Sequence, residues 1–151
     1  MPDHCFTYGS LMCEDIMGAV TAAAPLKPVP ARLAGYRRAP VIGVEYPGMI
    51  PAADGRVEGI LYLDLPASAW PRLDAFEGDE YLRSEVEVEL ADGRRLAAWA
   101  YVFKPEHAAR LAAGDWDFQR FLETGKAKFE ALYMGFDTLG REGAPKALAG
   151  R

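Results

Sequence analysis

Residues 81–103 constrain the fold of this chain more than any other stretch. Apolar residues alternate with the glutamates at positions 85, 87 and 89, an Asp92-Gly93 pair follows, and the stretch from Arg95 to Phe103 is again rich in aliphatic and aromatic side chains. Alternation with a period of two is typical of a strand that buries one face, and an Asp-Gly pair favours a tight turn between antiparallel strands. The pattern therefore predicts a β-hairpin whose glutamates face the solvent.

Strand and helix signals are mixed over the rest of the chain. The expected strands are 4–8, 57–63 and two weaker segments between 29 and 42 around Gly35, with a Pro-Gly turn at 46–52. The expected helices are one that follows Ser10 as its N-cap and three over 67–77, 105–113 and 117–133, the last capped by Asp115 or Asp117. Gly59 lies inside a strand, which indicates a bulge or a close backbone approach. Because strands and helices do not alternate regularly, we expect an α+β domain with a small, mostly antiparallel sheet or barrel.

The length and charge of the chain restrict its partners. Its 151 residues suit one domain, over 1–140, followed by a loose tail with Gly, Pro and charged residues at 141–151. The net charge is −5, from 17 basic and 22 acidic residues, and no basic run exceeds a pair such as Arg37-Arg38. Nucleic acid and anionic membranes both require a basic face, so neither is the expected partner.

The cysteines and histidines match no metal or catalytic motif. His4, Cys5 and Cys13 are not spaced like the ligands of a structural zinc site, so we expect no metal. Without a signal peptide or a long apolar run, a cytoplasmic protein with free thiols is expected. Ser10 lies in no G-x-S-x-G motif and fits a helix cap better than a nucleophile. The glycine-rich motifs of nucleotide sites are missing as well, so no cofactor is expected.

One short turn does fit an anion site. Tyr8-Gly9-Ser10-Leu11 joins an expected strand to the start of an expected helix. Backbone N–H groups at such a turn bind anions. A small anion such as a carboxylate is therefore a reasonable ligand for this turn.

Four carboxylates crowd residues 73–83. If Gly78 ends the preceding helix, Glu77 lies in the last turn, where the helix dipole disfavours a negative charge. Neighbouring carboxylates and burial would raise the pKa of Glu77 further. Asp79 and Glu80 are interpreted as solvated. Glu77 is thus the candidate acid–base residue of the chain, and a solvated acidic turn is the alternative interpretation.

Several motifs together point to a known family. The pieces are Phe6-Thr7-Tyr8-Gly9-Ser10-Leu11, Tyr46-Pro47-Gly48, Val57-Glu58-Gly59-Ile60-Leu61-Tyr62 and Leu73-Asp74-Ala75-Phe76-Glu77-Gly78, followed by Tyr81 and Arg83. This ordered set resembles the gamma-glutamyl cyclotransferase-like family, especially the branch with gamma-glutamylamine cyclotransferases and avirulence-induced plant homologues. The resemblance implies a small six- or seven-stranded β-barrel with flanking helices and a pocket in the barrel mouth. The site residues that it implies are Glu77 as general acid/base and a substrate-binding loop of Tyr8, Gly9, Ser10 and Leu11, extended through Met12 and Cys13.

The resemblance also implies a reaction. The α-amine of a γ-glutamyl compound attacks its own side-chain carbonyl, which gives 5-oxoproline and a free amine or amino acid without metal or cofactor. Two alternatives stay open: a related acyl-transfer or deprotecting enzyme that removes γ-glutamyl from a larger amine, and a non-catalytic binder of a small carboxylate ligand. Leu11 stands where some glutathione-acting members carry Asn, so the sequence does not specify the leaving amine.

Overall fold

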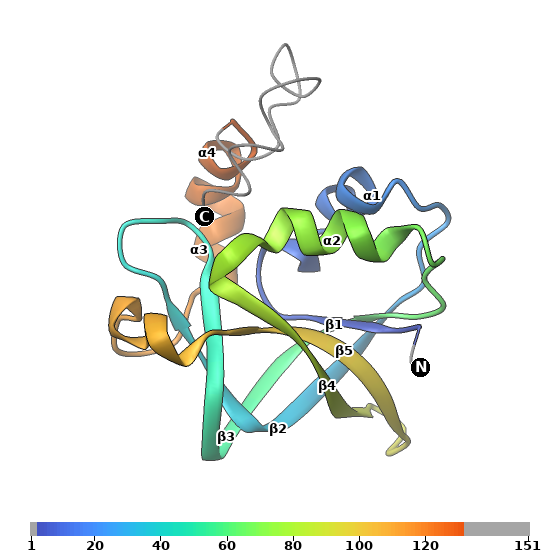
Figure 1. The fold of residues 1–151 in the computed structure, drawn as a ribbon, viewed down its shortest axis with the longest axis horizontal. Helices are drawn as coiled ribbons and strands as arrows, with labels where there is room; N and C mark the ends of the chain where they lie inside the picture. The colour runs from blue at the N-terminus through green and yellow to red at the C-terminus, as the bar shows by residue number, and fades with distance from the viewer. Residues whose placement is uncertain (1–2, 132–151) are drawn as a thin grey trace.

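The computed structural model describes residues 3–131, and Figure 1 shows their fold. The strands are β1 (Cys5–Thr7), β2 (Pro28–Pro40), β3 (Pro47–Tyr62), β4 (Tyr81–Leu90) and β5 (Arg95–Phe103). The α-helices are α1 (Glu14–Thr21), α2 (Ala69–Glu77), α3 (Phe118–Arg120) and α4 (Lys126–Phe129). The 3₁₀ helices are η1 (Ser10–Met12), η2 (Gly78–Glu80) and η3 (Pro105–Arg110), and a π-helical turn, η4 (Phe121–Gly125), joins α3 to α4.

The strands close into a barrel in the order β1-β3-β2-β4-β5 (Figure 1). The pairings are antiparallel, except that β1 and β5 meet in parallel at Cys5 and Trp99. The barrel interior is filled by one apolar cluster that includes Leu33, Leu61 and Val88. The predicted α+β fold with a mostly antiparallel barrel is confirmed. The hairpin is confirmed too, since Glu85 pairs with Trp99 and the even-numbered residues of β4 from Val86 to Leu90 are buried.

The described residues contain five strands rather than six or seven, because two long strands replace several shorter predicted segments. β2 continues through Gly35, where a bulge shifts its register against β3 and the glycine adopts a φ of 88°. β3 runs through both the predicted turn at 46–52 and the predicted strand at 57–63. A bulge lets a strand bend while its pairing continues. The predicted breaks are therefore bends within two paired strands.

Helices α1 and α2 lie across one end of the barrel (Figure 1). They are tied by the Arg72 side chain, whose Nε donates a hydrogen bond of 2.7 Å to the Val20 carbonyl. A second apolar cluster fills the space between these helices and the barrel; among its most buried members are Ile16, Met17, Leu73 and Phe76. The helices thus close the barrel end at which β1 leaves the sheet.

The end of α2 follows the prediction, whereas the start of α1 does not. Gly78 has a φ of 75°, and its N–H donates to the Asp74 carbonyl, so the helix ends at Glu77 as expected. Ser10 was expected to cap the next helix, but Ser10 is the first residue of η1, and the N-cap position of α1 is taken by Cys13. A 3₁₀ turn follows β1 first, and α1 begins only at Glu14.

The C-terminal helices are shorter than predicted. The segment expected to be helical over 105–113 forms only the 3₁₀ helix η3. The helix expected over 117–133 is a succession of α3, η4 and α4, capped at Asp117, whose side chain accepts from the Arg120 N–H. Residues 132 and 133 of the predicted helix and the predicted loose tail at 141–151 lie outside the described residues. Among residues 3–131, no helix has the length and apolar character needed to cross a membrane.

Gly59 supports a specific stability prediction. A Cβ at this position would overlap the Thr7 carbonyl oxygen, which confirms the close backbone approach expected from the sequence. We expect Gly59→Ala to lower the free energy of unfolding by about 2 kcal/mol or more, because β1 would have to move away from β3. Chemical denaturation measures this change.

Gly18 is the matched control. It lies inside α1, and its Cβ would come no closer than 3.8 Å to Leu26. Gly18→Ala should raise the free energy of unfolding by about 0.5–1 kcal/mol, since alanine is the better helix former. An equal effect of the two substitutions would contradict the proposed contact at Gly59.

Candidate active site

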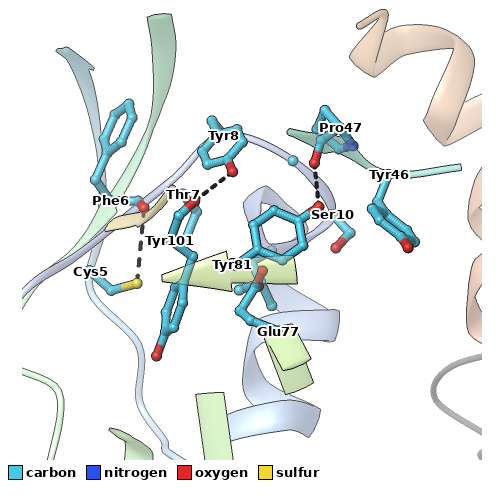
Figure 2. Close-up of a pocket in the computed structure, with 12 residues that line it drawn as sticks. Cys5, Phe6, Thr7, Tyr8, Ser10, Tyr46, Pro47, Glu77, Tyr81 and Tyr101 are labelled. Atoms are coloured by element: carbon cyan, nitrogen blue, oxygen red, sulfur yellow. Dashed lines mark hydrogen bonds between the residues drawn. The ribbon is translucent and has the colours of Figure 1, made fainter. Parts of the chain in front are cut away.

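Glu77 and the predicted loop line one pocket near the end of α2 (Figure 2). The residues that line it are Cys5, Phe6, Thr7, Tyr8, Gly9, Ser10, Leu11, Tyr46, Pro47, Glu77, Tyr81 and Tyr101. They come from β1 and η1, the start of β3, the end of α2, the start of β4, and β5. The cavity that remains between these side chains is small, about 30 Å³.

The loop after β1 is held by the strands beneath it. Thr7 Oγ1 donates to the Ile60 carbonyl over 2.7 Å, which extends the β1–β3 contact by one bond. Gly9 then passes directly over Pro47, since a Cβ at this position would lie 2.8 Å from Pro47 Cδ. Any larger residue at position 9 would push the two walls of the pocket apart. The Tyr-Gly-Ser turn therefore depends on glycine for a close approach.

The turn leaves several backbone donors available. The N–H groups of Met12 and Cys13 donate to the Gly9 and Ser10 carbonyls and so close η1. Within residues 3–131, the N–H groups of Gly9, Ser10 and Leu11 make no such backbone hydrogen bond. The first N–H groups of a helical turn lack acceptors for geometric reasons. Three successive donors thus belong to residues that line the pocket, as an anion site requires.

Glu77 is the last residue of α2, and only 9% of it is exposed. In Figure 2 its side chain rises from the helix end toward the Tyr81 ring and the turn that contains Ser10. The C-terminal end of a helix carries the negative end of the helix dipole, and burial removes water from a carboxylate. A carboxyl group that ends a helix and lines a pocket is placed where it can exchange protons with a bound molecule.

Four tyrosines line the pocket, and each donates its phenolic hydrogen to a specific acceptor. Tyr8 donates to the Tyr101 carbonyl over 2.6 Å, and Tyr81 donates to the Pro47 carbonyl over 2.7 Å. Tyr101 donates to Asp74 Oδ1 over 2.6 Å, and Tyr46 donates to Glu80 Oε1 over 2.9 Å. These bonds fix the directions of the rings, so the shape of the pocket is set by the folded chain.

The structure brings together most of the predicted site residues. Tyr8, Gly9, Ser10 and Leu11 line the pocket with Glu77, whereas Met12 and Cys13 lie outside its lining. Tyr46, Tyr81 and Tyr101 also line the pocket, whereas the Trp99 ring lies outside its lining and contacts the Arg83 guanidinium at 5.1 Å. Sequence reasoning missed Cys5, Phe6 and Thr7, although their place just before the glycine turn was a usable signal.

The two thiols are poor nucleophiles. Both cysteines are free and buried. Burial, and then the charge of Glu77, raise the pKa of the Cys5 thiol well above its ordinary range, and burial raises the pKa of Cys13 to about 11. Thiolates, not thiols, attack carbonyl carbons. Among the described residues that line the pocket there is no histidine, and Glu77 is the one carboxylic acid.

The interpretation of Glu80 as a solvated residue is wrong. Glu80 is only 4% exposed, and it accepts from Tyr46 and forms an ion pair with Arg110. Asp79, its neighbour, is exposed as expected. A 3₁₀ turn at Gly78–Glu80 carries the chain from α2 into β4 and directs the Glu80 side chain inward. Local charge patterning did not reveal this because both partners lie far along the chain.

Comparisons with known proteins define the family. The sequence model of the family described as gamma-glutamyl cyclotransferase, AIG2-like, matches residues 5–118, and the chain belongs to this family. It is 33% identical over 125 residues to AIG2-like protein C of Arabidopsis thaliana, a match that covers 82% of this chain and 72% of the relative. Family membership supports a cyclotransferase-type activity.

Solved structures share the fold. The solution structure of an Arabidopsis thaliana protein matches with a TM-score of 0.63 at 28% identity and covers 85% of each chain. A structure of a gamma-glutamyl cyclotransferase matches with a TM-score of 0.62 at 15% identity and covers 94% of this chain and 88% of the other. At this identity the second match concerns the fold alone.

The buried Glu80 leads to a stability prediction. Glu80→Ala removes the acceptor of the buried Tyr46 hydroxyl and the partner of Arg110, so we expect a loss of about 2–3 kcal/mol in the free energy of unfolding. Asp79→Ala, one residue away and exposed, should change it by less than about 0.5 kcal/mol. Urea denaturation of both variants measures the difference. Equal free energies of unfolding for the two variants would mean that the contacts of Glu80 with Tyr46 and Arg110 contribute nothing to stability.

Proposed function

We propose that this protein is a gamma-glutamyl cyclotransferase that converts a γ-glutamyl compound into 5-oxoproline and a free amine or amino acid, with Glu77 as general acid/base. The observation that carries the proposal is the pocket, where a buried carboxylate lines the same space as three residues whose N–H groups make no backbone hydrogen bond within residues 3–131. Family membership gives independent support.

The reaction suits a pocket without a nucleophile. The substrate α-amine attacks its own γ-carbonyl carbon, a five-membered ring closes, and the amide bond to the leaving amine breaks. Well-oriented intramolecular attack has an effective molarity of about 10⁵–10⁸ M, so the main task of the protein is to fold the substrate into the reactive shape. The tyrosine rings, fixed by their hydrogen bonds, are suited to this task.

Besides orienting the substrate, the protein has to transfer protons and to stabilise the negative charge that develops at the γ-carbonyl oxygen. The α-ammonium loses two protons as it becomes the lactam N–H. Glu77 takes them one at a time, before and after the attack, and gives each to the leaving nitrogen, so it ends the cycle in its starting state. The N–H groups of Gly9, Ser10 and Leu11 bind the substrate α-carboxylate or the oxyanion that forms at the γ-carbonyl. The cavity is small, about 30 Å³, so the proposal includes a shift of side chains at its wall when a γ-glutamyl group enters.

Glu77→Gln tests the mechanism. The substitution keeps the size of the side chain and removes the base, so turnover should fall about 10²–10⁴-fold. Released 5-oxoproline, measured by liquid chromatography, gives the rate. Asp79→Asn is the matched control, because it is an exposed acid two residues away that lines no part of the pocket, and it should keep wild-type turnover. A folded Glu77→Gln protein with wild-type turnover would refute the proposed role.

A substrate panel separates this function from its alternatives. Wild-type protein is incubated with γ-glutamyl amines, γ-glutamyl dipeptides, glutathione and bulky γ-glutamyl amines, and 5-oxoproline and glutamate are both measured. We expect 5-oxoproline as the product. Release of glutamate in its place would indicate hydrolytic deprotection. Tight binding of a γ-glutamyl compound without either product over hours would indicate a binding protein.

A further inference from the structure

Arg38, in β2, does not line the pocket but contacts one residue that does, Tyr8. Its side chain is only 13% exposed. Arg38 Nη1 donates to the Tyr8 carbonyl over 2.8 Å. Nε and Nη2 donate to the two oxygens of Asp115 over 2.8 and 3.1 Å, and the guanidinium lies 5.6 Å from the centre of the Trp116 ring. The guanidinium is therefore held in one orientation.

The contacts of Arg38 continue through Trp116 to the residue that precedes Tyr46. Trp116 donates its backbone N–H to Asp115 Oδ1 over 2.7 Å and its indole Nε1–H to the Glu45 carbonyl over 3.0 Å. Glu45 directly precedes Tyr46 and Pro47, which line the pocket. A continuous set of contacts thus joins the carbonyl of Tyr8, which lines the pocket, to the carbonyl of Glu45, which precedes the lining residues Tyr46 and Pro47.

We propose that Arg38 is a positioning residue that aims the Gly9 N–H at the substrate, an inference that rests on the proposed function. In a trans peptide the C=O and the following N–H point in opposite directions across a rigid plane. The bond from Arg38 to the Tyr8 carbonyl therefore sets the direction of the Gly9 N–H, the first of the three donors of the turn. Gly9 has no side chain to limit the rotation of this peptide, so a hydrogen bond from another residue is needed to fix its orientation.

The chemistry of the guanidinium explains why the residue is arginine. Its planar set of donors binds both oxygens of one carboxylate and still has an N–H for a third acceptor. Lysine has a point charge and cannot make the three contacts in this arrangement. The hydrogen bond from Arg38 also lowers the pKa of Asp115 below its ordinary value, so the carboxylate stays charged at neutral pH. The anchor is thus complete under the conditions in which the reaction would run.

The test compares Arg38→Ala and Arg38→Lys with Arg37→Ala, the exposed neighbour on the same strand. With the best γ-glutamyl substrate of the panel, both Arg38 variants should lose about 10–100-fold in kcat/KM, as expected for donors displaced by about 1 Å, and Arg37→Ala should match wild type. Added guanidinium at low, non-denaturing concentration should restore part of the activity of Arg38→Ala alone. A higher KM with unchanged kcat would indicate that the Gly9 N–H binds the substrate in the ground state. A lower kcat would indicate that it acts on the transition state.

A second readout does not require activity. The Gly9 amide resonance in ¹⁵N-labelled protein should shift in Arg38→Ala and in Asp115→Asn, which keeps the size of the carboxylate, and not in Arg37→Ala. An unmoved Gly9 resonance, or wild-type kcat and KM in a folded Arg38→Ala protein, would overturn the inference while the proposed function stands. If wild-type protein forms no 5-oxoproline, the proposed function fails. The Gly9 resonance alone then decides whether Arg38 sets the orientation of the peptide between Tyr8 and Gly9.

Discussion

The close passage of β1 over β3 at Gly59 is the constraint on which the rest of the structure depends. β1 has three residues, yet it pairs with β3 on one side and with β5 on the other, and so closes the barrel. Only a residue without a Cβ lets the Thr7 carbonyl come this near. The chain then leaves the barrel at Tyr8 in a direction set by this contact, and the turn meets Pro47 and the end of α2. A wider gap between β1 and β3 would separate the turn from Glu77.

Of the four acidic residues between positions 74 and 80, Asp74, Glu77 and Glu80 have three different environments. Asp74 accepts from Tyr101 and pairs with Arg83, whose guanidinium lies 5.1 Å from the ring centres of Trp70 and Trp99. Glu80 accepts from Tyr46 and pairs with Arg110. Each of these carboxylates orients a tyrosine that lines the pocket. Burying a charge is expensive unless it is paired, and the buried Glu80 is paired; Asp74, on the other side of Glu77 in the sequence, is exposed and paired as well.

Much of this arrangement was predictable from short patterns. The alternation of Val and Glu in β4 and the Asp-Gly turn specify a hairpin through side-chain period and backbone preference, which act within a few residues. The end of α2 was predictable because a glycine in the left-handed region commonly follows the last helical residue. Glu77 stood out among the acids for the same local reason, and the ordered motifs around it identified the family. In each of these cases the neighbouring residues carry the information.

The failures have a common physical cause. Gly35 and the Pro-Gly pair after Tyr46 are local signals to break a strand, but the long β2–β3 pairing outweighs them and turns the break at Gly35 into a bulge. Ser10 is a good cap by type, yet the contact of Gly9 with Pro47 imposes a 3₁₀ turn first. Glu80 is polar and sits among acids, so only Tyr46 and Arg110, both about 30 positions away, reveal that it is buried.

By itself, the sequence determined the hairpin, the C-terminal end of α2, the glycine turn and the identity of the family, because these depend on neighbouring residues or on motifs in a set order. The tertiary structure alone decided that β2 and β3 are continuous, that Met12 and Cys13 lie outside the pocket lining, and that Arg38 binds the Tyr8 carbonyl. These outcomes rest on tertiary contacts, which span 7 to 34 positions between β2 and β3 and 77 positions between Arg38 and Asp115. No local pattern encodes such contacts, since they exist only once the barrel has closed.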